Sequence, residues 1–197
     1  MSEVITKKSI AIFASFFLLF GCQKNLPTIF KDSLKRNGDR LTSYDFAEVC
    51  NGYYLSQAVE YQPTTNNVHP IHIFEREEVG DKFENRVFYF PDIPETWTVS
   101  GMELDVTELV ACITRLPGEL IDICTYEESI STNLYDVAYE IKLIVAMTGE
   151  EIDKTIINPD KQCPLVTSFI EGEENIKDYP SLDPKRLKEF LQPHIIQ

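Results

Sequence analysis

The clearest pattern of alternating side chains runs over residues 134–146, LYDVAYEIKLIVA. The odd positions from Tyr135 to Val145 are apolar or aromatic, and the positions between them include Asp136, Glu140 and Lys142. A side-chain period of two is typical of a β-strand with one buried face. We therefore predict a strand over residues 134–146, which turns at Thr148-Gly149 into a second strand at 151–157.

The C-terminal segment shows the spacing of a short amphipathic helix. Asp183 is a good N-cap, and Pro184 suits the first helical position because its missing N–H has no partner there. Three apolar residues follow at helical spacing: Leu187, Phe190 and Leu191. We predict that the helix begins after Asp183 and that Pro193 ends it.

Shorter elements precede these. One or two helical turns are predicted over residues 42–50, capped by Thr42 or Ser43. Strands are predicted over residues 69–74, with Pro70 at the start or at an edge, and over residues 86–90. Together the patterns predict an α+β fold, a single domain dominated by an antiparallel sheet, with a short C-terminal helix.

Residues 109–126 read as a β-hairpin. Two β-rich runs, LVACITRL and LIDICTY, flank Pro117-Gly118, a dipeptide typical of turns. Setting Cys112 opposite Cys124 keeps apolar residues paired with apolar residues, whereas a slip of one residue does not. This register favours a Cys112–Cys124 disulfide.

The N-terminal residues have the layout of an export signal. Lys7 and Lys8 precede an apolar run at residues 10–20, which as a helix would span about 16 Å and is too short to cross a bilayer. The following Gly21-Cys22, preceded by Leu19, resembles a bacterial lipobox. We therefore predict a lipoprotein-type signal peptide at 1–21, lipid on Cys22, a tether at 22–41 and one disulfide-stapled domain at 42–197. The alternative is an ordinary signal peptide that is cleaved near Cys22.

With Cys22 assigned to lipid, four cysteines remain: Cys50, Cys112, Cys124 and Cys163. An even number of cysteines in an exported chain predicts two disulfides, with three possible connectivities. The hairpin register favours Cys112–Cys124, which leaves Cys50–Cys163.

The order of several short stretches resembles a domain of uncharacterised bacterial extracytoplasmic proteins, common in cyanobacteria and Chloroflexi. The resemblance implies an extracytoplasmic location and disulfides, and it supplies no active site. It rests on these stretches: 49–52, 57–61, 68–71, 109–113, 124–126, 146–150, 163–164 and 187–194.

Composition narrows the classes of function. The chain has 18 Lys and Arg against 32 Asp and Glu, a formal net charge of −14, which argues against a nucleic-acid partner. The sequence has no GxSxG nucleophile motif and no glycine-rich phosphate loop, and we expect no cofactor.

His69 and His72 are the candidate metal ligands, with the carboxylates of Glu75, Glu77 and Glu78 close behind. A step of three residues places the two histidines on opposite faces of a strand, so structural or surface roles are favoured over a shared ion. The aromatic residues are expected mostly in the core, with any exposed set forming a recognition face for a protein or a glycan: Tyr53, Tyr54, Tyr61, Phe88, Tyr89, Phe90 and Trp97.

These features favour a non-enzymatic protein of the cell envelope, held at the membrane by lipid on Cys22, that binds or scaffolds a protein or glycan partner. Two alternatives from other classes remain. One is a metal- or carboxylate-dependent hydrolase of the envelope, and the other is a carrier of a small ligand in a β-rich cavity.

Overall fold

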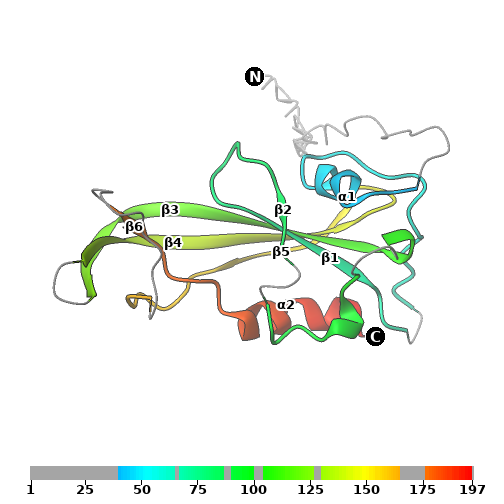
Figure 1. The fold of residues 1–197 in the computed structure, drawn as a ribbon. Coiled ribbons are helices and arrows are strands. Elements are labelled where there is room, and N and C mark those ends of the chain that lie inside the picture. The colour runs from blue at the N-terminus through cyan, green and yellow to red at the C-terminus, as the bar shows by residue number, and fades with distance from the viewer. Residues whose placement is uncertain are drawn as a thin grey trace, which may run out of the picture.

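The computed structural model describes residues 40–64, 67–86, 90–99, 104–126, 130–164 and 176–196. These residues form one twisted sheet with a helix on each face (Figure 1). The sheet order is β2-β1-β3-β4-β5, and β6 pairs with β4. The strands are β1 (Ile71–Arg76), β2 (Glu84–Asn85), β3 (Leu109–Tyr126), β4 (Ile130–Val145), β5 (Glu151–Ile157) and β6 (Lys177–Asp178). The helices are α1 (Ser43–Val49) and α2 (Pro184–Ile195), with short 3₁₀ turns at Glu95–Trp97 and Leu104–Val106.

The sheet is mixed, so the expectation of an antiparallel sheet is wrong in part. β1 runs parallel to β3, and β6 runs parallel to β4, whereas β1–β2, β3–β4 and β4–β5 are antiparallel. Parallel neighbours need a crossover connection, and the chain between Arg76 and Leu109 provides it for β1 and β3. The dominance of strands and the short C-terminal helix are as predicted, as are the strands at 134–146 and 151–157.

Each face of the sheet has its own apolar core. The core under α2 takes the odd-numbered residues of β1, β3 and β4, such as Ile73, Ile113 and Ile141, and packs them against Leu187 and Leu191. The core under α1 takes even-numbered residues, including Phe74, Val110, Cys112 and Ile144, and packs them against Phe46 and Val49. The strict alternation of a strand therefore builds both cores from the same three strands.

Pro117-Gly118 lies inside β3 and does not form a turn, which corrects the predicted hairpin. β3 continues through the dipeptide to Tyr126, and its partner is β4 over nearly its whole length. The register shifts between Pro117 and Leu120, and again between Leu120 and Asp122. Such shifts are typical of β-bulges. A bulge accommodates proline, which has no N–H to donate, where no second strand needs a donor at that position. β1 pairs with β3 only as far as Thr114, so that edge has no described strand beside it at Pro117.

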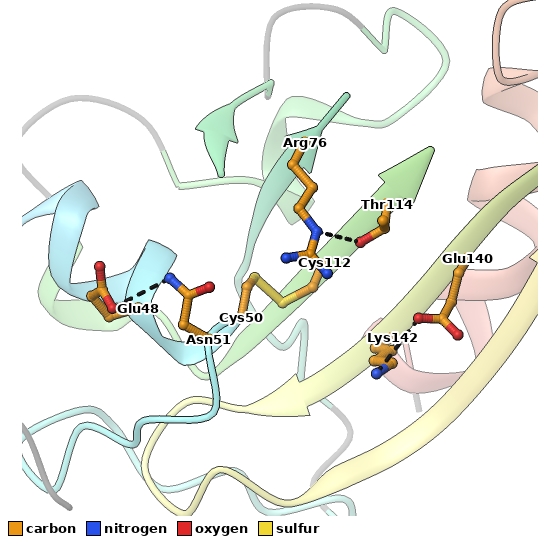
Figure 2. The surroundings of a disulfide bond; sticks show 8 residues. All are labelled: Glu48, Cys50, Asn51, Arg76, Cys112, Thr114, Glu140 and Lys142. Atoms are coloured by element: carbon orange, nitrogen blue, oxygen red, sulfur yellow. Dashed lines mark hydrogen bonds and ion pairs between the residues drawn. A yellow bond between two sulfur atoms is a disulfide. The ribbon is translucent and has the colours of Figure 1, made fainter. Parts of the chain in front are cut away.

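Both disulfides differ from the favoured pairing. Cys50 bonds Cys112, with Cα atoms 5.5 Å apart, and Cys124 bonds Cys163, with Cα atoms 5.6 Å apart. Because β3 is one continuous strand, the twelve positions from Cys112 to Cys124 span about 40 Å at ~3.3 Å per residue, far beyond disulfide range. Cys50–Cys112 instead ties the end of α1 to the centre of the sheet (Figure 2). All four predicted cysteines are nevertheless in disulfides.

The ends of the helices follow the sequence signals with one exception. Thr42 caps α1 in a capping box with Asp45, and the Asp183 side chain accepts a hydrogen bond from the N–H of Lys185 at the start of α2. Pro193, however, lies within α2, which ends at Ile195. The last turn is held because Ile195 is buried and its carbonyl accepts a hydrogen bond from the N–H of His69.

Some predictions fall on residues outside the described ranges. These are the signal peptide at 1–21, the lipid site at Cys22, the tether except for Arg40 and Leu41, and the centre of the strand predicted at 86–90. The described part of that region forms β2 at Glu84–Asn85, two residues before the predicted start.

Candidate functional site

Three cavities of the described part of the chain lie at or beside the edge strand β2. Residues 82–86 contribute to three cavities, with volumes of about 420, 280 and 270 Å³. The largest lies on the α1 face of the sheet, the smallest lies on the α2 face, and the third lies along the edge between them. We refer to this region as the β2 edge. Cavities of different chemistry thus lie close to one another at one edge of the sheet.

The cavity on the α1 face has an apolar floor and a polar rim. Ala47 and Phe74 line it together with Phe83, and all three are largely buried. The phenol of Tyr44 stands at the rim and is 83% exposed. Ser43 and Asn85 add a hydroxyl and an amide, and the Asn85 Nδ2 atom lies 3.5 Å from Ser43 Oγ. This lining suits an apolar group that carries a hydrogen-bonding neighbour.

His72 supports this cavity from behind. The imidazole is fully buried between the rings of Phe46 and Phe74, at centroid distances of 5.8 and 4.9 Å. Burial lowers the pKa of His72 to about 4, because a charged imidazole would be poorly solvated there. The ring is therefore neutral near pH 7, and its Nε2 atom accepts a hydrogen bond from Asn85 Nδ2 at 2.9 Å. The contact orients the Asn85 amide at the rim.

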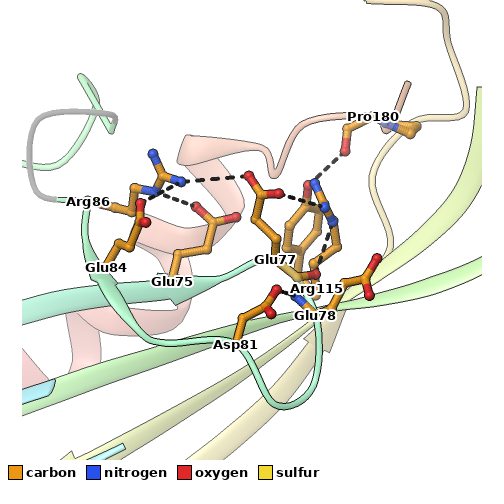
Figure 3. A network of polar contacts seen from close by, with 9 residues as sticks. Glu75, Glu77, Glu78, Asp81, Glu84, Arg86, Arg115 and Pro180 are labelled. Atoms are coloured by element: carbon orange, nitrogen blue, oxygen red, sulfur yellow. Dashed lines mark hydrogen bonds and ion pairs between the residues drawn. The ribbon is translucent and has the colours of Figure 1, made fainter. Parts of the chain in front are cut away.

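On the α2 face, two arginines share three carboxylates (Figure 3). Arg86 lies 3.6 Å from Glu75, 3.9 Å from Glu77 and 3.4 Å from Glu84. Arg115 lies 3.3 Å from Glu77 and also donates from its Nε atom to the Glu77 carbonyl. Since three carboxylates face two guanidinium groups, this group carries one excess negative charge when all five are ionised.

Tyr139 and Tyr179 lie beside this group of arginines and carboxylates. The Arg115 guanidinium lies over the Tyr179 ring at 4.1 Å, a cation–π contact. The Tyr139 hydroxyl donates a hydrogen bond to the Pro180 carbonyl at 2.9 Å. Burial raises the pKa of Tyr139 to about 12, so it remains a donor. Burial also raises the pKa of Glu75, despite the opposing charges of Arg86 and Arg115.

The two candidate histidines contact residues that pack on opposite faces of the sheet. His69 Nδ1 lies 2.6 Å from Glu108 Oε2, and its ring meets Tyr61 edge-on at 4.8 Å, beside the end of α2. His72 lies on the other face, under α1. The two imidazoles are therefore not brought together. Within the described ranges, no three His, Cys, Asp or Glu side chains are grouped so that they could hold a metal ion.

Of the seven aromatic residues considered for a recognition face, the structure describes five: Tyr53, Tyr54, Tyr61, Phe90 and Trp97. Tyr53 and Tyr54 are half-buried. Trp97 and Phe90 are buried in the core under α2, and Tyr61 packs against that core. Phe88 and Tyr89 lie outside the described ranges. Among the described residues that line these three cavities, the exposed aromatic residue is Tyr44, which no sequence pattern indicated. Only the packing of α1 beside β2 shows its position.

This chain matches no protein-family model, no curated protein and no solved structure. The resemblance to bacterial extracytoplasmic domains thus stays an expectation. The two disulfides indicate an oxidising, extracytoplasmic environment. None of the helices in the described part of the chain has the length and apolar character needed to cross a membrane.

Proposed function

We propose that this chain is a lipid-anchored protein of the bacterial cell envelope, with a non-enzymatic domain that binds a partner. Two disulfides support the location, because such bonds persist in oxidising compartments. The basic residues, the short apolar run and Gly21-Cys22 support export and lipid attachment.

One observation carries the binding role. Residues of β2 line two cavities, one with an apolar floor and one rich in charged side chains, and Arg86, which follows β2, lines a third with two tyrosines. Ligand sites are typically concave and mostly apolar, with a few convergent polar groups. The cavity under α1 has this form, with an apolar floor of Ala47, Phe74 and Phe83 and polar groups at its rim, and a protein or glycan partner is the class of ligand proposed for it.

The anchor is tested by replacing Cys22. Full-length protein and the Cys22→Ser variant are expressed in a bacterium that processes lipoproteins, and each is fractionated and weighed intact. We expect the unchanged protein in the membrane fraction, with its first 21 residues removed and a mass increase from acyl chains. The variant should lose the acyl mass. An unmodified Cys22 or a retained Met1 would contradict the proposal.

The binding role is tested by cross-linking in intact cells. A photoreactive amino acid replaces exposed Lys82 at the β2 edge or, as a control, exposed Glu119 on β3. A partner bound at the edge gives a discrete cross-linked band from position 82 and none from position 119. Equal bands at both positions, or none at either, would contradict a partner at this edge.

A carboxylate-dependent hydrolase is the second candidate, and Glu75 favours it. Burial raises the pKa of this carboxyl, as general acids require, and Glu77 is two residues further along the chain with a side chain that is 61% exposed. The test is hydrolysis of p-nitrophenyl esters and glycosides. Activity that is lost in Glu75→Gln but kept in Tyr44→Ala would support the enzyme over the binding domain.

A further inference from the structure

We propose that the β2 edge binds an extended segment of a protein partner in which one large apolar side chain stands between two basic residues. The inference rests on the proposed binding function and adds the class of ligand. An extended segment that lies along a sheet edge sends successive side chains to opposite faces of the sheet. Both residues of β2 line the cavity under α1, and Glu84 also lines the cavity along the edge, beside the arginine–carboxylate group.

The register of β2 shows which chemistry lies on which face. Asn85 is opposite Phe74, which packs under α1, and Glu84 is opposite Glu75, which faces the α2 side. A segment beside β2 would therefore direct one side chain into the cavity under α1. Its two neighbours would point to the arginine–carboxylate group on the other face.

The cavity under α1 selects the apolar side chain. Its volume of about 420 Å³ and its floor of Ala47, Phe74 and Phe83 suit one aromatic or branched aliphatic group. Tyr44, at 83% exposure, has most of its ring available for burial by an incoming side chain. Burial of apolar area on both partners favours this contact.

The opposite face selects the basic neighbours. The Arg86 side chain is only 20% exposed, whereas those of Glu77 and Glu84 are 61% and 69% exposed. These two carboxylates therefore keep open sides toward solvent. The cavity that they line also takes Arg76, Asp81 and Lys82, so four carboxylates face three cationic side chains there. Lysine or arginine would neutralise this excess, and the net charge of −14 over the chain attracts a basic partner from a distance. The same net charge opposes a second copy of this chain as the occupant.

The probe is the synthetic peptide acetyl-Gly-Thr-Lys-Phe-Lys-Thr-Gly-amide. Two matched peptides carry serine in place of phenylalanine, or glutamate in place of both lysines. Binding to full-length protein, purified in mild detergent with its disulfides intact, is measured by isothermal titration and by shifts of backbone amide signals. We expect the first peptide to bind at least tenfold more tightly than either matched peptide, with shifts that centre on Ala47, Glu84 and Asn85.

Substitutions of exposed residues test whether the peptide binds at the β2 edge, and they are not expected to destabilise the fold. Glu84→Lys should weaken binding of the first peptide at least tenfold, and Tyr44→Ala should weaken it at least threefold. Glu119→Lys makes the same change in net charge on distant β3, and Val106→Ala trims another exposed apolar side chain; each should change binding less than twofold.

Several results would overturn the proposal. These are equal binding of all three peptides, no binding of any, equal weakening by Glu84→Lys and Glu119→Lys, or amide shifts that centre on β3 and β4. Sedimentation showing a dimer that Tyr44→Ala dissociates would assign the edge to a second copy instead. Cellular cross-links from position 82 together with failure of the peptides would leave the binding function standing and remove only this ligand class.

Discussion

The Nε2 atom of His72 lies 2.9 Å from the amide nitrogen of Asn85, so a fully buried imidazole fixes a side chain of the edge strand β2. The contact requires His72 to be neutral, since only a neutral ring has an acceptor nitrogen. The cavity on the α1 face thus depends on the protonation state of a residue that does not line it.

This dependence predicts a loss of stability in mild acid. The pKa of His72 falls from 6.5 to about 4 on folding, so the unfolded chain binds the proton more readily. The free energy of unfolding is therefore not reduced by this effect above pH 6.5, and it falls by up to about 3 kcal/mol as the pH is lowered toward 4. Urea unfolding of His72→Phe should show a weaker pH dependence between 4 and 6.5. Val106→Ala, which changes an exposed side chain that does not titrate, is the control and should keep the pH dependence of the unchanged protein.

Glu75 predicts the opposite trend at higher pH. Because burial raises its pKa above 4.5, the folded state holds the proton more tightly than the unfolded chain. The part of the free energy of unfolding that comes from the protonated Glu75 carboxyl is fully present below pH 4.5. It declines as the pH rises through the folded-state pKa. Glu75→Gln, which cannot ionise, should therefore gain stability relative to the unchanged protein as the pH is raised from 4 to 8. The exposed Glu119→Gln should show no such gain, and an equal gain there would assign the effect to net charge.

Loss of the Tyr139 hydroxyl should measurably lower the free energy of unfolding. Replacement by phenylalanine removes the hydroxyl that donates to the Pro180 carbonyl, in a side chain that is 4% exposed. A hydrogen bond of this kind contributes about 1 kcal/mol, so Tyr139→Phe should lower the free energy of unfolding by about that amount. Tyr44→Phe, at an exposed site, should change it by less than about 0.5 kcal/mol. Equal effects in the two variants would contradict a stabilising role for the Pro180 contact.

The two disulfides should differ in their rate of reduction. Cys163 is exposed, whereas Cys50 is half-buried and Cys112 and Cys124 are buried. Thiol attack requires access to a sulfur, so limiting dithiothreitol should open Cys124–Cys163 first. Alkylation and peptide mapping at short times would show this order. Simultaneous opening of the two bonds would contradict the difference in access.

With loops of 62 and 39 residues, each bond should contribute about 4 kcal/mol on the chain-entropy model. Replacing both cysteines of either bridge by serine should therefore lower the free energy of unfolding by a similar amount.

Local patterns predicted the regular elements well. The alternation over 134–146 identified β4 as a strand, although residues on both of its faces are buried rather than on one. Asp183 with Pro184 marked the start of α2. The error at Pro117-Gly118 arose because the same dipeptide suits a turn or a bulge, and only the pairing with β4 distinguishes them. That single error also produced the wrong disulfide pairing.

The β2 edge could not be predicted, because its parts are distant in sequence. Tyr44, Glu75, Arg86, Arg115 and Tyr139 come from five separate elements or loops, and the parallel pairing of β1 with β3 helps bring them together. Nothing in the sequence indicated a parallel pair, since β1 is short and the described residues of its crossover include no long helix. His69 lies before β1, so the expected three-residue step within a strand does not apply, although the two rings contact residues that pack on opposite faces of the sheet.

The connectivity of the disulfides bears on how an exported chain would mature. After Cys22, the bridges join the first cysteine to the second and the third to the fourth in order of synthesis. An oxidase that links thiols as they emerge from a translocon, N-terminus first, would therefore make each native bond directly. Such a chain would reach its final covalent form with no help from a disulfide isomerase.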